Sequence, residues 1–226
     1  MSVFTVTNPK GGSSKTTSTL LLATTLAHFG QRVLVIDSDR NEPLMKWASK
    51  RDDEKLQVIK REDKEVMYAI EELRPRYDYI IVDTEGTANN TIGYALSRTD
   101  LAILPIGISQ LDVDQAGRAM DFIEAQSRAL SRPIPYRLLF TKTNAGFQTR
   151  LERAIRQDAK DDNVVAFETS IMQRTAYTDI FYRGLTLYEL VGTEVSGVER
   201  AIENAEAFAK EVVAVVKAVS RQKETA

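Results

Sequence analysis

The chain has 226 residues, of which 43% are hydrophobic, so it can bury a core, and its length does not require a second domain. It contains no cysteine, which excludes disulfides, thiolate zinc sites and cysteine-held iron–sulfur clusters. Thirty basic and 32 acidic residues give a net charge of -2, so nucleic-acid binding would require a local cationic patch.

Short apolar runs rich in Val and Ile alternate with longer amphipathic stretches along the chain. Strands that are apolar at consecutive positions, such as 80–82, are typical of parallel sheets covered by helices on both faces. The pattern predicts an α/β fold with a doubly wound, mostly parallel sheet flanked by helices, in one domain over 1–226 with a flexible tail at 220–226. The expected strands are 3–7, 33–36, 79–82, 101–106 and 136–140, and the expected helices are 15–29, 43–50, 64–73, 90–97, 112–129, 147–158 and 195–219.

A loop with two adjacent glycines follows the first expected strand and leads directly into a helix. In this context, successive backbone N–H groups and the helix N-terminus point at a phosphate. Lys15 would reach the β- and γ-phosphates of a nucleotide, and Thr16 would ligate Mg²⁺. The predicted phosphate-binding residues are Lys10, Gly11, Gly12, Ser13, Ser14, Lys15, Thr16 and Thr17.

This loop resembles the deviant Walker A motif, KGGxGKT, of the ParA/MinD family of ATPases, with Lys10 as the additional lysine. Residues 41–47, 104–109 and 171–184 are similar to small ParA proteins, above all ParF-type plasmid partition ATPases, and also to ParA-like proteins that assist T-DNA transfer. In this family the additional lysine crosses a dimer interface to the partner's nucleotide. The resemblance therefore implies an ATP-bound homodimer and catalytic roles for Lys10 and Lys15.

Two positions depart from the family's loop. Pro9 stands at the first glycine of the ordinary Walker pattern, and Ser14 stands where the family has glycine. If the backbone at Ser14 has a positive φ, a residue other than glycine costs on the order of 1 kcal/mol, and its side chain crowds the phosphate. A weakly active scaffold protein that assists conjugative DNA transfer is therefore an alternative to a fully active ATPase.

Acidic residues follow two of the expected strands at their carboxyl ends, which face the ligand crevice in open α/β sheets. Asp37 and Asp83 are predicted, with Thr16, to hold the Mg²⁺ shell, because this ion prefers oxygen ligands and keeps several waters. The ParA resemblance implies that Asp39 positions or activates the attacking water. Residues 84–87, which follow Asp83, are expected to form a flexible switch loop.

The end of the fifth expected strand bears on the choice of base. Guanine-specific P-loop proteins carry an NKxD motif, whereas residues 140–144 read FTKTN, which favours ATP over GTP. The resemblance implies that the adenine lies near Thr141, Lys142 and Thr143 and near loop 170–173. The expected cofactors are thus ATP and Mg²⁺.

Basic side chains in three regions are candidates for DNA binding. Nonspecific binding requires clustered cations that displace counterions from the phosphates, and an ATP-bound dimer would double any patch by symmetry. Ordinary solvated helix surfaces account for these residues equally well, and the family resemblance favours DNA. The candidates are Arg150, Arg153 and Arg156, then Arg174 and Arg183, and finally Lys217, Arg221 and Lys223.

The resemblance implies a cytoplasmic, nucleoid-associated DNA partition ATPase that is stimulated by a small centromere-binding adaptor protein. A MinD-like ATPase on a membrane is the alternative, and it would carry a C-terminal helix with bulky apolar residues opposite lysines. Here the last expected helix has an apolar stripe followed by a polar tail, which favours packing on the sheet over membrane binding. The stripe consists of Ile202, Phe208, Val212, Val213, Val216 and Val219.

Overall fold

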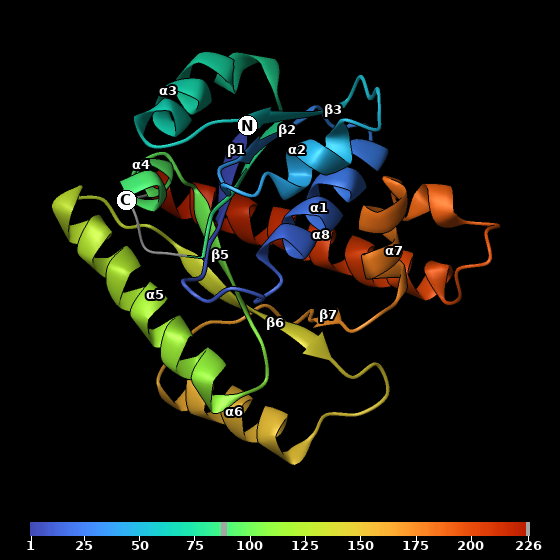
Figure 1. Cartoon of the computed structure of the whole chain (residues 1–226). Coiled ribbons are helices and arrows are strands. Elements are labelled where there is room, and N and C mark those ends of the chain that lie inside the picture. Colours follow the sequence, from blue (N-terminus) through green and yellow to red (C-terminus); the bar gives the residue numbers. More distant parts are fainter. Residues whose placement is uncertain (87–89, 225–226) are drawn as a thin grey trace.

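A seven-stranded parallel sheet forms the centre of the computed structural model, which describes residues 1–86 and 90–224, without the side chains of 222–224 (Figure 1). Its order is β3-β2-β4-β1-β5-β6-β7, and every pairing is parallel. β1 lies between β4 and β5, so the chain winds outward in both directions, which confirms the doubly wound fold. The strands are β1 (Ser2–Val6), β2 (Val33–Asp37), β3 (Leu56–Lys60), β4 (Tyr79–Asp83), β5 (Leu101–Ile106), β6 (Tyr136–Thr143) and β7 (Ile171–Met172).

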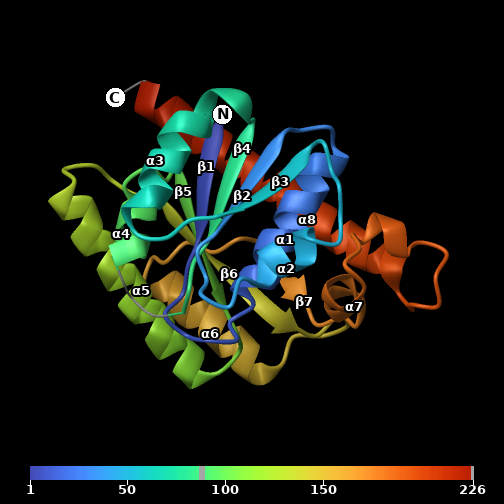
Figure 2. The ribbon, with the colours of Figure 1, turned by 45° about the horizontal axis from the view of Figure 1, so that its top comes forward.

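Helices cover both faces of this sheet (Figure 2). On one face lie α1 (Lys15–His28), α2 (Pro43–Ala48), α7 (Ala176–Arg183) and α8 (Val198–Glu224), and on the other lie α3 (Lys64–Leu73), α4 (Asn90–Leu96), α5 (Gln110–Ala129) and α6 (Arg150–Asp161). Successive residues of a strand point to opposite faces, so Ile81 packs under α1 while Ile80 and Val82 pack under α3. The consecutive apolar positions of the sequence therefore serve two cores.

Most expected elements agree with the structure to within a few residues, and α3 and β5 agree at both ends. α6 begins three residues later than expected, at Arg150, because Thr149 accepts a hydrogen bond from the N–H of Glu152 as the N-cap. The sequence interpretation missed β3, β7 and α7. β3 is a half-exposed edge strand, and β7 has two residues and exists through its pairing with β6.

The apolar stripe of the last helix packs on the sheet as expected. Phe208 and Val212 are fully buried in α8, and Val216 is nearly so. α8 continues through Glu224, so residues 220–224 of the expected tail are helical, and 225–226 lie outside the described residues. Among the described helices, none is both long and apolar enough to cross a bilayer.

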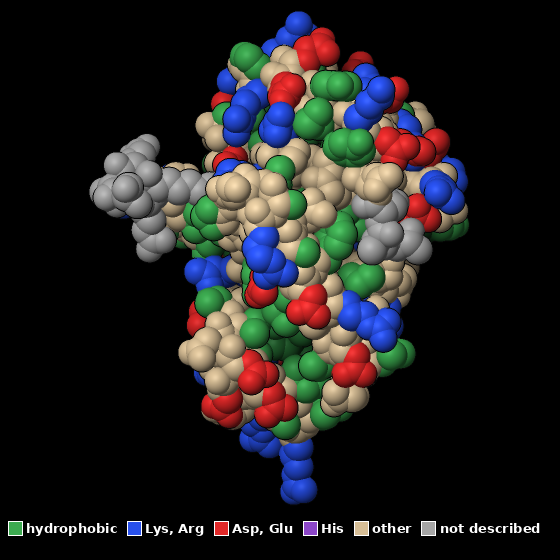
Figure 3. Space-filling view, turned by 90° about the vertical axis from the view of Figure 1, so that its left-hand side faces the viewer, with side chains coloured by type: hydrophobic (Ala, Val, Ile, Leu, Met, Phe, Trp, Pro, Cys, Tyr) green, Lys and Arg blue, Asp and Glu red, His purple; other side chains and the backbone are tan. Residues whose placement is uncertain are grey.

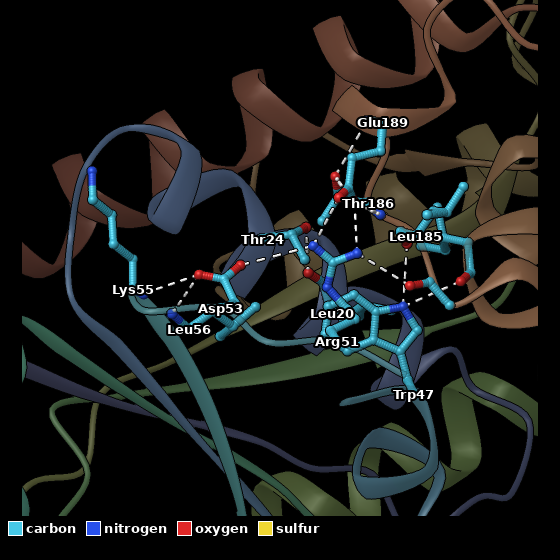
Figure 4. Close-up of polar contacts among 12 residues, drawn as sticks. Leu20, Thr24, Trp47, Arg51, Asp53, Lys55, Leu56, Leu185, Thr186 and Glu189 are labelled. Atoms are coloured by element: carbon cyan, nitrogen blue, oxygen red, sulfur yellow. Dashed lines mark hydrogen bonds and ion pairs between the residues drawn. The ribbon is translucent and has the colours of Figure 1, made fainter. Parts of the chain in front are cut away.

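A polar cluster joins α2 to the segment that precedes α8 (Figure 4). The Arg51 guanidinium binds both carboxylate oxygens of Glu189, at 2.6 and 3.0 Å, and the carbonyl of Gly184 at 3.1 Å. The indole Nε1 of Trp47 donates to the carbonyls of Ile180 and Leu185. These contacts fix α2, and with it the loop after β2, against the C-terminal part of the chain.

The opposite face carries a cavity of about 510 Å³ between α3, α4 and α5. Figure 3 shows this face, where hydrophobic side chains lie between charged ones. The lining includes Met67, Tyr94, Phe122, Gln126 and Leu130, and it shares no residue with the cavity at the phosphate loop described next.

Candidate functional site

The loop between β1 and α1 has the backbone geometry of an anion-binding loop. Gly12 and Ser14 both have left-handed conformations, with φ of 73° and 70°, and α1 begins at the following Lys15. Asn8 holds the start of the loop, since its Nδ2 donates to the carbonyl of Pro105 at 2.7 Å and its Oδ1 accepts from the N–H of Lys10 at 2.9 Å. Ser14 thus has the positive φ that makes a non-glycine residue costly.

A cavity of about 360 Å³ lies against this loop, and Lys15 extends along it. The ammonium of Lys15 donates to the carbonyl of Lys10 at 3.0 Å, and the residue is 7% exposed. Burial lowers the pKa of this ammonium, while the carboxylates of Asp83 and Asp39 act in the opposite direction. The lining comprises Gly11, Gly12, Ser13, Ser14, Lys15, Thr16, Thr17, Asp39, Gly86 and Lys142.

Asp83 lies at the carboxyl end of β4 and binds the start of α1. The hydroxyl of Thr16 donates to its Oδ2 at 2.8 Å, and the hydroxyl of Thr19 donates to its Oδ1 at 2.9 Å. The carboxyl is fully buried, and burial raises its pKa to about 7 despite these two hydrogen bonds. The structure therefore brings together Thr16 and Asp83, two of the three residues expected at the metal.

The third residue, Asp37, caps α2 in this structure. Its Oδ2 accepts from the N–H groups of Leu44 and Met45 at 2.9 and 3.0 Å, and its Oδ1 accepts from the N–H of Asp39 at 3.1 Å. Burial raises the pKa of Asp37 against these backbone hydrogen bonds. Both of its oxygens are thus engaged by the backbone, while the strand register still places it beside Asp83.

Asp39 lies at the rim of the cavity. Its Oδ1 accepts from the N–H and the side-chain amide of Asn41, at 2.8 and 3.1 Å, and the ammonium of Lys60 donates to its carbonyl. In the described part of the chain, no three acidic or histidine side chains converge on one point.

The segment 84–86, which follows Asp83, lies against the phosphate loop. A Cβ atom at Gly86 would lie 3.2 Å from the N atom of Gly11 and 3.3 Å from the ammonium of Lys15, so glycine permits this close approach. The hydroxyl of Thr84 donates to the carbonyl of Val6 at 3.0 Å. The expected switch loop thus begins against the site, and its last residue, Thr87, lies outside the described residues.

Lys10 forms an ion pair within its own chain. Its ammonium lies 2.8 Å from Oδ1 of Asp112, on the first turn of α5; the Lys10 side chain is partly exposed and the Asp112 side chain is largely buried. The Lys10 ammonium and the Ser109 hydroxyl lower the pKa of Asp112 against its burial. The sequence interpretation missed Asp112, although a serine three residues before an acidic residue is a recognisable helix start.

A smaller cavity, of about 170 Å³, lies on the other side of the loop, between β6, β7 and α7. It brings Lys142 together with Met172 and Gln173, which come from the two segments predicted to lie near the base. Thr141 and Thr143 are buried in the adjoining strand, and the Thr141 hydroxyl contacts the carbonyl of Ser13 at 3.3 Å. The complete lining is Ser14, Thr17, Lys142, Ile171, Met172, Gln173, Arg174, Tyr177 and Thr178.

The candidate DNA-binding cations do not form one group. Arg150 and Arg153 are exposed on α6, but the Arg156 side chain is 19% exposed and is bound to Glu152 and Ser170, with its guanidinium 4.0 Å from the centre of the Phe140 ring. Lys217 and Arg221 lie near the end of α8, which is far from α6 in both ribbon views (Figures 1 and 2). The side chain of Lys223 is outside the described part.

Comparison with known proteins gives consistent matches over the whole chain. The family model described as VirC1 protein matches residues 1–225. A ParA protein of Rhizobium radiobacter is 29% identical over 211 residues, which are 92% of this chain and 95% of that protein. A plasmid partition protein of Borrelia burgdorferi bound to AMPPNP is 20% identical, with a TM-score of 0.70 over 92% of this chain and 98% of the other. The cell division protein MinD of Aquifex aeolicus is 21% identical, with a TM-score of 0.72 over 95% and 98%.

Proposed function

Because the chain belongs to the VirC1 protein family, and so to the ParA/MinD-type ATPases, we propose that it is a DNA partition ATPase that dimerises with ATP. We propose further that the dimer binds DNA nonspecifically and that a small adaptor protein stimulates hydrolysis. The observation that carries this proposal is the cavity that Lys15, Thr16 and Asp39 line together. It lies beside a loop in which Gly12 and Ser14 have positive φ.

The residues present fit ATP with Mg²⁺. The loop amides and Lys15 suit the phosphates, and the hydroxyl of Ser13 is buried without a hydrogen-bond partner among the described residues. Thr16, backed by Asp83, would hold Mg²⁺, which keeps several waters and completes its shell with phosphate oxygens. Bound Mg²⁺ would neutralise charge on the phosphates during transfer.

The remaining side chains have separate roles in this proposal. Lys15 stabilises the negative charge on the transferred phosphoryl group, and its low exposure strengthens this interaction. Asp39, at the rim, orients the attacking water and accepts its proton. Gly86 closes one side of the cavity against the loop and limits the access of other water.

Lys10 would act across the dimer. In the single chain, its ammonium is paired with Asp112, and a partly exposed ion pair of this kind contributes about 1 kcal/mol or less. A partner subunit's triphosphate carries more charge than one carboxylate, so dimerisation with ATP would draw Lys10 away from Asp112. This exchange would make the site complete only in the ATP-bound dimer.

For DNA, the proposal rests on Arg150 and Arg153, which are exposed on α6. Arg156 is excluded from the surface patch by its internal contacts with Glu152 and Ser170. Two-fold symmetry in a dimer would double the α6 cations, and phosphate contacts of this kind give a binding constant that falls with salt.

The direct test is ATP hydrolysis with Mg²⁺, measured with and without DNA, for the wild type and the Asp39→Ala variant. We expect slow turnover in the wild type and a loss of about a hundredfold or more in Asp39→Ala, because the water loses its base. Asp114→Ala is the matched control, since Asp114 lies exposed on α5 and its carboxylate accepts a hydrogen bond from Gln110 on the same helix. Equal rates in the wild type and Asp39→Ala would contradict the proposal.

A second candidate is a weakly active scaffold that assists DNA transfer, and the left-handed Ser14 favours it. Under this alternative the natural chain hydrolyses ATP at background rate, and Ser14→Gly restores turnover. Measuring Ser14→Gly in the same assay distinguishes the two functions.

A further inference from the structure

The end of β6 holds the phosphate loop through its carbonyl groups. The Lys142 ammonium donates to the carbonyl of Gly12 at 2.8 Å, and the Thr141 hydroxyl contacts the carbonyl of the next residue, Ser13, at 3.3 Å. Both donors come from a strand 128 or more residues further along the chain. The Thr141 hydroxyl also lies 3.1 Å from the carbonyl of Ile106, so its one hydrogen is shared, and the Lys142 contact is the one that fixes the Gly12 peptide unit.

Fixing a carbonyl also fixes an amide. The peptide unit is planar and trans, so the carbonyl of Gly12 and the N–H of Ser13 point in opposite directions. An ammonium on the carbonyl oxygen strengthens the N–H as a donor, because hydrogen bonds in a chain polarise one another. Lys142 thereby both orients and strengthens the Ser13 N–H.

The backbone at Lys142 is held in a conformation that lysine rarely adopts. Its φ is 56°, at an irregularity in the register of β6 with β7 between Thr141 and Thr143. Such conformations persist where surrounding contacts determine them, and they gather at functional sites. Lys142 also lines both cavities, the one at the phosphate loop and the smaller one toward Met172 and Gln173.

We propose that Lys142 is a positioning residue for phosphate binding: by holding the Gly12 carbonyl, it aims the Ser13 N–H at the nucleotide's phosphates. Its side chain lines both cavities, together with Ser14 and Thr17, and so links the seating of the base to the geometry of the loop. The inference rests on the proposed function, since it assumes that the site binds a nucleotide.

The test compares Lys142→Met, which keeps the length of the side chain without its charge, with Lys142→Arg, which keeps a cationic donor. Calorimetry measures the binding of Mg-ADP and of Mg-pyrophosphate, which has no base. We expect Lys142→Met to weaken both ligands about tenfold and Lys142→Arg to recover to within about threefold. Lys210→Met is the control, because Lys210 lies exposed on α8 and pairs with Glu206.

Hydrogen exchange of the unliganded protein separates loop positioning from direct contact with the ligand. Lys142→Met should speed the exchange of the amides in residues 11–14, with an unchanged melting temperature. The inference is overturned if this exchange is unchanged, or if Lys142→Met weakens ADP but leaves pyrophosphate within twofold, since Lys142 would then act on the base. If the wild type binds neither ligand, the proposed function itself fails.

Discussion

The two sides of the candidate site differ in burial and in how they are built. On the phosphate side, the carboxyls of Asp37 and Asp83 are fully buried and Lys15 is nearly so, on elements in the centre of the sheet. On the base side, Lys142 and Gln173 are exposed and lie at an edge that ends in a two-residue strand. A buried charge depends strongly on its partners, whereas at the exposed edge solvent replaces most of the contacts of a side chain such as Gln173, which does not hold the phosphate loop as Lys142 does.

The pKa shifts of the buried groups on the phosphate side also reflect this difference in burial. Burial moves Lys15, Asp37 and Asp83 toward their neutral forms in the absence of a ligand. A triphosphate with Mg²⁺ would supply the missing charges, so the phosphate side is arranged for an occupied state. Among the described residues, the side at β6 and β7 has no comparable set of buried charges to compensate, and the role that we propose for it is to hold the loop in place.

The largest expected effect separates the two sides directly. Lys15→Met should reduce ATP affinity about a hundredfold or more, because it removes a cation from a poorly solvated phosphate site. Gln173→Ala, on the base side, should reduce it by no more than about fivefold, since its side chain is exposed. Calorimetric titration with Mg-ATP measures both, and similar losses in the two variants would show that the sides do not differ as described.

The next effect is on stability as a function of pH, measured by urea denaturation without nucleotide and with EDTA. The pKa of Asp83 is about 7 in the fold and near 3.9 in an unfolded chain, so the folded form binds the proton more tightly. Its stabilising contribution is therefore present below the unfolded pKa and is lost as pH rises through about 7. Compared with an Asp83→Asn variant, the wild type should lose free energy of unfolding between about pH 4 and about pH 8.

An exposed acid provides the control for this experiment. Asp114→Asn, on α5, should follow the wild type across the whole range. A constant difference between the wild type and Asp83→Asn at all pH values would mean that Asp83 is already ionised in the empty site.

The smallest expected effect tests backbone strain on the phosphate side. Ser14→Gly should raise the free energy of unfolding by about 1 kcal/mol, because φ of 70° is strained for serine. Gly12→Ala is the matched reverse change, at φ of 73° and with no atom within 4 Å of the added Cβ, and should lower it by a similar amount. Thermal denaturation measures both, and a destabilised Ser14→Gly would show that the serine side chain contributes more than its backbone costs.

The sequence by itself determined the doubly wound fold, the phosphate loop and the acids at the carboxyl ends of β2 and β4. These features are local, since a glycine loop between a strand and a helix and an acid after an apolar run are visible within about ten residues. The apolar stripe of α8 was equally readable, because its burial follows from helical spacing.

Only the tertiary structure decided which partners these residues have. It paired Lys10 with Asp112, placed Asp37 at the start of α2, bound Arg156 to Glu152, and brought Lys142 to the Gly12 carbonyl. These contacts join residues from 4 to 130 positions apart, and most bind a side chain to a backbone atom or to a side chain of another element. The Arg156–Glu152 pair has the i,i+4 spacing of a helix and could have been predicted, but spacing carries no signal for the other pairs, because their distance is set by how the strands and helices pack.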